Sequence, residues 1–227
     1  SIRVEGGIKE NAQATLDAGF LAFRVSVADP AGESPFVSQR MVRKTAENCA
    51  GIREAIRPDA DWCIDYHRRL DFPDAVRLST LLEPLEPYFC EDLVRSENPG
   101  VYRGLRKQVK VPIAVGEQFG TRWEFNELVE QHLIDYNRTS IPNCGGVTEY
   151  VKQAAMCETH YVGLTPHFTG PVSEAALVHV CAAFSGPVLM ELAGTYKLDI
   201  PYLPQHFDYK DGKLWPNDRP GLGVTLD

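Results

Sequence analysis

The sequence lacks the features that would place it at a membrane or on a nucleic acid. No apolar run approaches the ~20 residues that a membrane span needs, and no basic-then-apolar signal peptide opens the chain. Basic residues are not in excess, since 31 acidic against 23 basic side chains give a net charge of -8. That balance offers no electrostatic footprint for nucleic acid or for an anionic membrane surface. We therefore expect a partner that is a small molecule.

Paired cysteines are also missing. The six cysteines show no CxxC spacing; they are Cys49, Cys63, Cys90, Cys144, Cys157 and Cys181. A structural zinc site normally needs cysteines at such spacings, and three of these cysteines lie in or beside predicted core strands or turns, which argues against a disulfide framework. We therefore predict reduced thiols and a cytoplasmic protein.

Apolar runs and helix-like segments alternate along most of the chain. The expected strands are residues 2–5, 20–27, 62–67, 87–90, 111–116, 134–140, 161–165 and 188–190. The expected helices are residues 9–18, 37–56, 72–85, a segment ending near 108, 123–132, 147–159 and 172–184. Such alternation predicts a TIM-like (β/α)8 barrel of parallel strands wrapped by helices, over residues 1–201.

The last residues, 202–227, break this alternation. They are rich in proline, glycine and aromatic residues, and Asp211-Gly212 is a hairpin turn signal. We expect an irregular C-terminal tail that packs on the barrel or against another domain.

Three acidic residues follow three successive apolar runs at equal spacing. Asp65 and Glu91 are 26 positions apart, and so are Glu91 and Glu117. A barrel of this kind carries its active site at the carboxyl ends of its strands, so the three carboxylates should converge. Converging carboxylates repel one another unless a hard cation lies among them, and Mg²⁺ prefers oxygen ligands. The spacing therefore predicts a Mg²⁺ site.

Two histidines and a further acid fall at the same end of the predicted strands. His67 stands two positions after Asp65, which on a strand would place both side chains on one face. His167 follows the strand at 161–165, and Glu191 ends the strand at 188–190. Each of these residues alone could be an ordinary loop or core residue, and the regular spacing of the three acids favours a shared site. We interpret the remaining histidines as structural; they are His132, His160, His179 and His206.

Six ordered motifs carry a family resemblance across nearly the whole chain. They are Asp65-Tyr66-His67, Phe89-Cys90-Glu91-Asp92, Val115-Gly116-Glu117, Cys144-Gly145-Gly146-Val147-Thr148-Glu149, Thr165-Pro166-His167 and Leu189-Met190-Glu191. Together they resemble the barrel domain of the enolase superfamily, in its mandelate racemase-like branch. The resemblance implies a modified (β/α)7β barrel that follows an N-terminal capping domain, and we expect that domain to be absent from this chain.

The resemblance also implies roles for the candidate residues. Asp65, Glu91 and Glu117 would bind Mg²⁺, His67 and His167 would act as acid or base, and Glu191 would bond the substrate carboxylate. In this superfamily a base removes the proton next to a carboxylate and Mg²⁺ stabilises the resulting enediolate.

Further segments resemble the sugar-acid dehydratases of the mannonate and galactonate type. They are Val115-Gly116-Glu117-Gln118-Phe119, Leu133-Ile134-Asp135-Tyr136, Asp211-Gly212-Lys213-Leu214 and Pro220-Gly221-Leu222-Gly223-Val224. The Lys-x-Lys pair of other branches is missing from residues 22–26, which favours histidine chemistry. The resemblance thus implies elimination of the 3-hydroxyl to give a 2-keto-3-deoxy acid, with His167 as the preferred base and His67 as the acid.

Three positions depart from the family pattern. Leu93 stands where the family commonly has proline, and Ser140 where galactonate-type enzymes support the histidine with an aspartate. Arg24 could match the substrate-site arginine of mannonate dehydratases, but the tyrosine that accompanies it has no counterpart before Tyr66. The base could therefore be His167 or a residue outside this segment. Two alternatives stay open: a racemase or epimerase of a 2-hydroxy acid, and a non-catalytic, metal-binding or regulatory barrel. We expect a homo-oligomer that binds a sugar acid or hydroxy acid.

Overall fold

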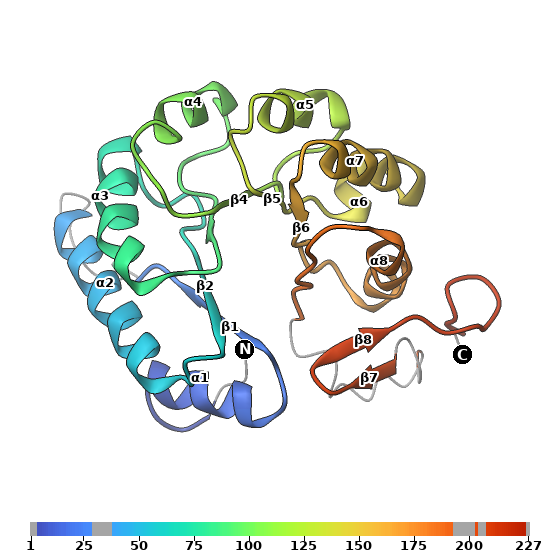
Figure 1. Ribbon diagram of the computed structural model, residues 1–227, viewed down its shortest axis with the longest axis horizontal. Coiled ribbons are helices and arrows are strands. Elements are labelled where there is room, and N and C mark those ends of the chain that lie inside the picture. The colour runs from blue at the N-terminus through green and yellow to red at the C-terminus, as the bar shows by residue number, and fades with distance from the viewer. Residues whose placement is uncertain (1–3, 29–37, 193–202, 204–207, 226–227) are drawn as a thin grey trace. The chain divides into compact units, whose positions relative to one another are not determined.

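The computed structural model describes residues 4–28, 38–192, 203 and 208–225 of the chain. The chain divides into two compact units, Ser1–Ala114 and Val115–Asp227 (Figure 1). The limit predicted between barrel and tail, at residues 201 and 202, lies outside the described residues and stays a prediction. The helix start expected at Val37 and the residue His206 also lie outside the described residues.

The first unit alternates helices and strands as the sequence predicts. Its elements are α1 (Ile8–Asp17), β1 (Ala22–Ser26), α2 (Ser38–Ala55), β2 (Asp61–Asp65), α3 (Phe72–Leu82), η1 (Glu83–Leu85), β3 (Cys90–Glu91), η2 (Pro99–Val101), α4 (Tyr102–Leu105) and β4 (Ile113–Val115), whose last residue opens the second unit. The strands pair in chain order, β1-β2-β3-β4, and every pair is parallel. Parallel pairing puts the carboxyl ends of these strands at one edge.

Strand β2 is the buried centre of the first unit. Trp62 and Ile64 are fully buried on one face of the strand. Their neighbour Cys63 points to the opposite face and is buried as well. A strand that is apolar on both faces is typical of a parallel sheet covered by helices. Helices α2 and α3 lie side by side next to β1 and β2 (Figure 1). The Trp62 Nε1–H donates to the Leu85 carbonyl at 2.9 Å, which ties η1 to the strand.

The second unit continues the alternation. Its elements are α5 (Arg122–Glu130), β5 (Tyr136–Asn137), α6 (Ile141–Cys144), α7 (Val147–Thr159), β6 (Gly163–Leu164), α8 (Pro171–Ala183), β7 (Asp208–Lys210) and β8 (Lys213–Trp215). Strands β5 and β6 pair in parallel, and the Arg138 N–H donates to the Val115 carbonyl at 2.8 Å. Helix α5 begins at a capping box in which Thr121 and Glu124 satisfy each other's backbone N–H groups.

Two expected strands are not formed as predicted. Val4 and Glu5 belong to no strand, and Ile2 and Arg3 lie outside the described residues. The strand expected at residues 188–190 is reduced to a single parallel bridge between Leu164 and Val188. Pro187, directly before it, has no N–H to donate, which shortens the ladder that this segment can make.

The hairpin predicted at Asp211-Gly212 is confirmed. Strands β7 and β8 are antiparallel, and Asp211 and Gly212 between them have φ angles of 53° and 74°. Positive φ at both central residues is the type I′ geometry that matches the twist of a hairpin. Further along the tail, the His179 Nε2–H of α8 donates to the Leu222 carbonyl at 3.3 Å.

Gly116 allows the chain that leaves β4 to run against the residues that follow β5. Its φ angle is 153°, and a Cβ at this position would lie 2.7 Å from the Arg138 carbonyl carbon and closer still to the Thr139 nitrogen. Neither atom can move without moving the backbone. Glycine is therefore required for this close approach.

We predict that Gly116→Ala lowers the free energy of unfolding by about 2–3 kcal/mol, because the added methyl overpacks two backbone segments. Gly145→Ala is the matched control: its φ is also positive, at 98°, but a Cβ there has nothing within 4 Å. That change should lose only about 1 kcal/mol of conformational strain. Urea unfolding followed by circular dichroism measures both, and equal losses would contradict the packing argument.

Candidate functional site

Two of the predicted metal ligands end neighbouring strands of the first unit. Asp65 is the last residue of β2 and Glu91 the last residue of β3, and they are paired in register. In-register residues of parallel strands present their side chains on the same face. Their exposed fractions are 4% for Asp65 and 0% for Glu91, so two carboxylates lie buried at adjacent positions.

Arg24 of β1 contacts both of these acids. Its Nη1 lies 2.8 Å from Glu91 Oε2 and 3.5 Å from Asp65 Oδ2. The guanidinium provides positive charge where two buried carboxylates would otherwise repel each other. The sequence predicted Arg24 as a substrate-binding residue, and this contact with the acids was not foreseen.

The strand that was predicted to carry both Asp65 and His67 ends before His67. Strand β2 ends at Asp65, and His67 and Arg68 have φ angles of 50° and 60°, which break the alternation of a strand. His67 still stays close to Asp65, because its backbone N–H donates to Asp65 Oδ1 at 2.7 Å. The His67 ring is exposed, and its Nε2 accepts from Arg68 Nη2 at 3.2 Å, since an arginine only donates.

Asp92 is buried and paired with an arginine. Arg68 Nη1 lies 2.8 Å from Asp92 Oδ2, and the Arg68 N–H donates to the Asp92 carbonyl at 3.1 Å. Asp92 itself has a φ of 45°. These contacts fix the segment after β2, which carries His67, to the end of β3.

In the second unit, the third predicted ligand contacts one of the predicted catalytic histidines. Glu117 is 5% exposed, and its Oε2 lies 3.1 Å from His167 Nε2. The Glu117 carbonyl accepts from Asn143 Nδ2 at 2.8 Å, which holds the backbone of the turn after β4. The structure thus brings Glu117 and His167 together.

Glu191 is held by Arg138, which the sequence analysis missed. Arg138 is 1% exposed; its Nη2 lies 2.9 Å from Glu191 Oε2 and its Nη1 donates to the Thr165 carbonyl at 3.0 Å. The Phe168 N–H donates to the same Glu191 oxygen at 3.1 Å. Arg138 therefore fixes Glu191 to the segment that carries His167. A charged residue inside the apolar run 134–140 was the available signal, because a buried guanidinium needs an ionic partner.

Ser140 does not take over the role of the aspartate that supports the histidine in galactonate-type enzymes. It is fully buried before α6, and within the described part of the chain its Oγ has no hydrogen-bond partner. His167 instead contacts Glu117.

The donor atoms fit a hard divalent cation. Asp65 and Glu91 in the first unit and Glu117 in the second offer carboxylate oxygens, without a sulfur ligand among them. Oxygen-only donors suit Mg²⁺ better than zinc or copper. Buried carboxylates also gain most from a compensating cation.

The six cysteines, all of which lie in the described residues, are buried thiols without disulfides. Burial raises the pKa of the Cys49, Cys157 and Cys181 thiols to about 12. A thiol with such a pKa carries almost no thiolate at neutral pH, so these cysteines are not candidate nucleophiles. No helix in the described residues is both long and apolar enough to cross a membrane.

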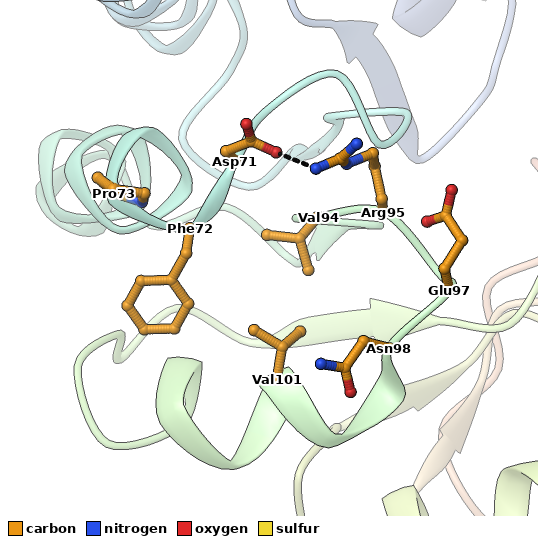
Figure 2. A pocket seen from close by; sticks show the side chains of 8 residues that line it. All are labelled: Asp71, Phe72, Pro73, Val94, Arg95, Glu97, Asn98 and Val101. Atoms are coloured by element: carbon orange, nitrogen blue, oxygen red, sulfur yellow. Dashed lines mark ion pairs between the residues drawn. The ribbon is translucent and has the colours of Figure 1, made fainter.

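A separate pocket of about 540 Å³ lies in the first unit (Figure 2). Phe72, Val94 and Val101 give it an apolar lining, and Asp71 and Arg95 form an ion pair of 3.0 Å beside them. Its lining contains none of the predicted catalytic, substrate-binding or metal-binding residues.

Residues 7–227 match the family model described as enolase C-terminal domain-like, and the chain belongs to this family. A D-galactonate dehydratase family member of Streptomyces bingchenggensis is 36% identical over 181 residues, which cover 78% of this chain and 44% of that protein. A D-mannonate dehydratase of Caulobacter sp. is 37% identical over 199 residues, 86% of this chain and 49% of that protein. The chain spans about half the length of these curated relatives.

A solved structure of an enolase superfamily member from Salmonella Typhimurium has the same fold. The TM-score is 0.89 at 25% identity, with 96% of this chain and 59% of that chain covered. The parallel α/β barrel class and the enolase superfamily membership predicted from the sequence are therefore confirmed.

We predict that Arg138→Met lowers the free energy of unfolding by about 3 kcal/mol or more, because it removes the guanidinium from a largely buried carboxylate. The control is Arg95→Met, which breaks an ion pair whose side chains are 66% and 72% exposed. An exposed pair contributes about 0.5 kcal/mol or less. Chemical denaturation measures the free energy of unfolding of both variants. Similar losses would show that the ion pair of Arg138 with Glu191 does not stabilise the fold.

Proposed function

We propose that the whole protein of which this chain is part is a Mg²⁺-dependent dehydratase of a sugar acid. The observation that carries the proposal is the in-register pair of buried carboxylates, Asp65 and Glu91, at the carboxyl ends of parallel strands. The printed names of the curated relatives, D-galactonate and D-mannonate dehydratase, support this choice of reaction.

Asp65, Glu91 and Glu117 would hold the cation. When bound, Mg²⁺ supplies positive charge that stabilises the charge developing on the substrate carboxylate as the neighbouring proton leaves. Residues of this chain would position the substrate carboxylate and transfer two protons.

His167 is the preferred base. Its Nε2 contact with Glu117 holds the ring beside a predicted ligand, so a substrate carboxylate bound there would present its α-carbon to the histidine. His167 would take the α-proton first, and the electron pair of the broken C–H bond would be delocalised into the substrate carboxylate. In a second step that electron pair would form the C=C bond while the 3-hydroxyl departs with a proton from His67, giving water and an enol that becomes the 2-keto-3-deoxy acid.

Glu191 would bind the substrate carboxylate. Its carboxylate is held by Arg138 and the Phe168 N–H, and is therefore oriented before any substrate arrives. Such preorganisation reduces the entropy lost on binding.

Racemisation or epimerisation at the same carbon is the alternative reaction. It would use the same proton abstraction and differ only in that no hydroxyl leaves. Incubating the intact protein with a panel of sugar acids and assaying 2-keto products separates the two reactions.

We also propose that the protein is a cytoplasmic homo-oligomer. The six thiols without disulfides support a cytoplasmic location.

The metal assignment predicts the effect of Glu91→Gln. The change keeps the size of the side chain and removes one negative charge, so Mg²⁺ affinity should fall by roughly 100-fold or more while the fold persists. Titration calorimetry measures the affinity and circular dichroism the fold. Glu97→Gln, an exposed change on the loop after β3, is the control and should bind as the unaltered protein does. Unaltered binding by Glu91→Gln would remove this residue from the ligand set.

The histidine assignment predicts two different defects in the intact protein. His167→Asn should abolish exchange of the substrate α-proton with deuterated solvent, because no base remains to remove it. His67→Asn should abolish loss of the hydroxyl and retain detectable exchange, since proton abstraction comes first. Proton NMR follows exchange, and a 2-keto assay follows elimination. Exchange that survives in His167→Asn and disappears in His67→Asn would reverse the two roles.

A further inference from the structure

We propose that Arg24 is an internal cation that competes with Mg²⁺ for Asp65 and Glu91, so that the arginine and the metal ion weaken each other's hold on these carboxylates. The inference rests on the proposed function only for the identity of the metal. It assigns Arg24 a role in setting metal affinity, beyond any contact with substrate.

The geometry supporting this competition lies entirely in the first unit. The Arg24 Nη1 is 2.8 Å from Glu91 Oε2, a charge-assisted hydrogen bond, and 3.5 Å from Asp65 Oδ2. One guanidinium nitrogen therefore approaches an oxygen of each of two predicted ligands, Asp65 and Glu91. Those two oxygens belong to carboxylates that are almost completely buried.

A guanidinium and a divalent cation both require these negatively charged carboxylate oxygens as partners. Each binds through the lone pairs of carboxylate oxygens, and each carries positive charge into a region of low dielectric constant. Binding of Mg²⁺ must therefore either displace the Arg24 contact or tolerate a like charge within a few ångströms. Both possibilities reduce metal affinity relative to a site without the arginine.

The same contact stabilises the protein without metal. Burying Asp65 and Glu91 side by side is unfavourable unless a cation compensates their charge. Arg24 supplies one unit of positive charge from its own strand, so the fold does not depend on Mg²⁺ to hold these two strand ends together. Thermodynamic reciprocity requires that a residue which stabilises the carboxylates in this way opposes the ligand that replaces it.

Arg68 offers a comparison within the same unit. It also lies 2.8 Å from a buried carboxylate, but its partner is Asp92, which is not among the predicted ligands. Arg24 contacts two of the predicted ligands, and Arg68 contacts none of them. Loss of Arg68 should therefore change the Mg²⁺ affinity less than loss of Arg24.

The test is a Mg²⁺ titration by calorimetry of the intact protein and three variants. Arg24→Met, which removes the charge and keeps a long side chain, should bind Mg²⁺ about tenfold or more tightly than the unaltered protein. Arg24→Lys keeps the charge and should stay near the unaltered affinity. Arg68→Met is the matched control and should tighten binding much less than Arg24→Met.

Thermal unfolding gives a readout that does not depend on activity. In EDTA, Arg24→Met should unfold at a lower temperature than the unaltered protein, and saturating Mg²⁺ should raise its unfolding temperature by more than it raises that of the unaltered protein. If Arg24→Met does not fold, side-chain NMR of the unaltered protein replaces it: the Arg24 guanidinium resonances should shift as Mg²⁺ is added. Unchanged resonances at saturation would overturn the proposal.

The outcomes separate this inference from the proposed function. Equal or weaker Mg²⁺ binding by Arg24→Met, with clear binding by the unaltered protein, would overturn the competition and leave the dehydratase proposal standing. Absence of Mg²⁺ binding in both proteins would overturn both proposals. Binding by Arg24→Met alone would be the strongest form of the predicted effect.

Discussion

Buried carboxylates at the ends of parallel strands are the constraint on which the rest of this structure depends. Asp65 and Glu91 in the first unit, and Glu191 in the second, each have an arginine within hydrogen-bond distance. A buried charge without such compensation is strongly destabilising, so strand ends that carry acids must also carry cations. Arg24 in the first unit and Arg138 in the second therefore each accompany acids for which we propose a chemical role.

The alternation of apolar runs and helical segments was sufficient to predict most of the fold. Helix α7 was predicted with its observed ends, and the hairpin at Asp211-Gly212 follows directly from its turn residues. These features depend on local chemistry, namely helix periodicity, capping and positive φ. The strand predicted at residues 188–190 is only a single bridge in the structure. An apolar composition indicates burial but does not by itself supply the backbone hydrogen bonds of a strand.

The candidate acids could be found from the sequence because their spacing reflects a repeated strand-and-helix unit. Their partners could not, because Arg24, Arg68 and Arg138 reach acids that lie 41, 24 and 53 positions away in the chain. Such contacts depend on the register of strands and on the paths of loops. The prediction that His67 lies on the same strand as Asp65 failed for a related reason. Period-two alternation assumes that the strand continues, whereas β2 ends at Asp65.

The backbone at the ends of β2 and β3 limits how this site can be altered. His67, Arg68 and Asp92 all have positive φ angles, a conformation that bulky and β-branched side chains adopt only at considerable strain. A library that randomises these positions in search of new substrates would incur about 1–2 kcal/mol of backbone strain for each disfavoured side chain. Libraries that keep Arg68 and restrict positions 67 and 92 to Asn, Asp, Gly and His, with wider variation at positions of ordinary backbone geometry, would avoid that strain.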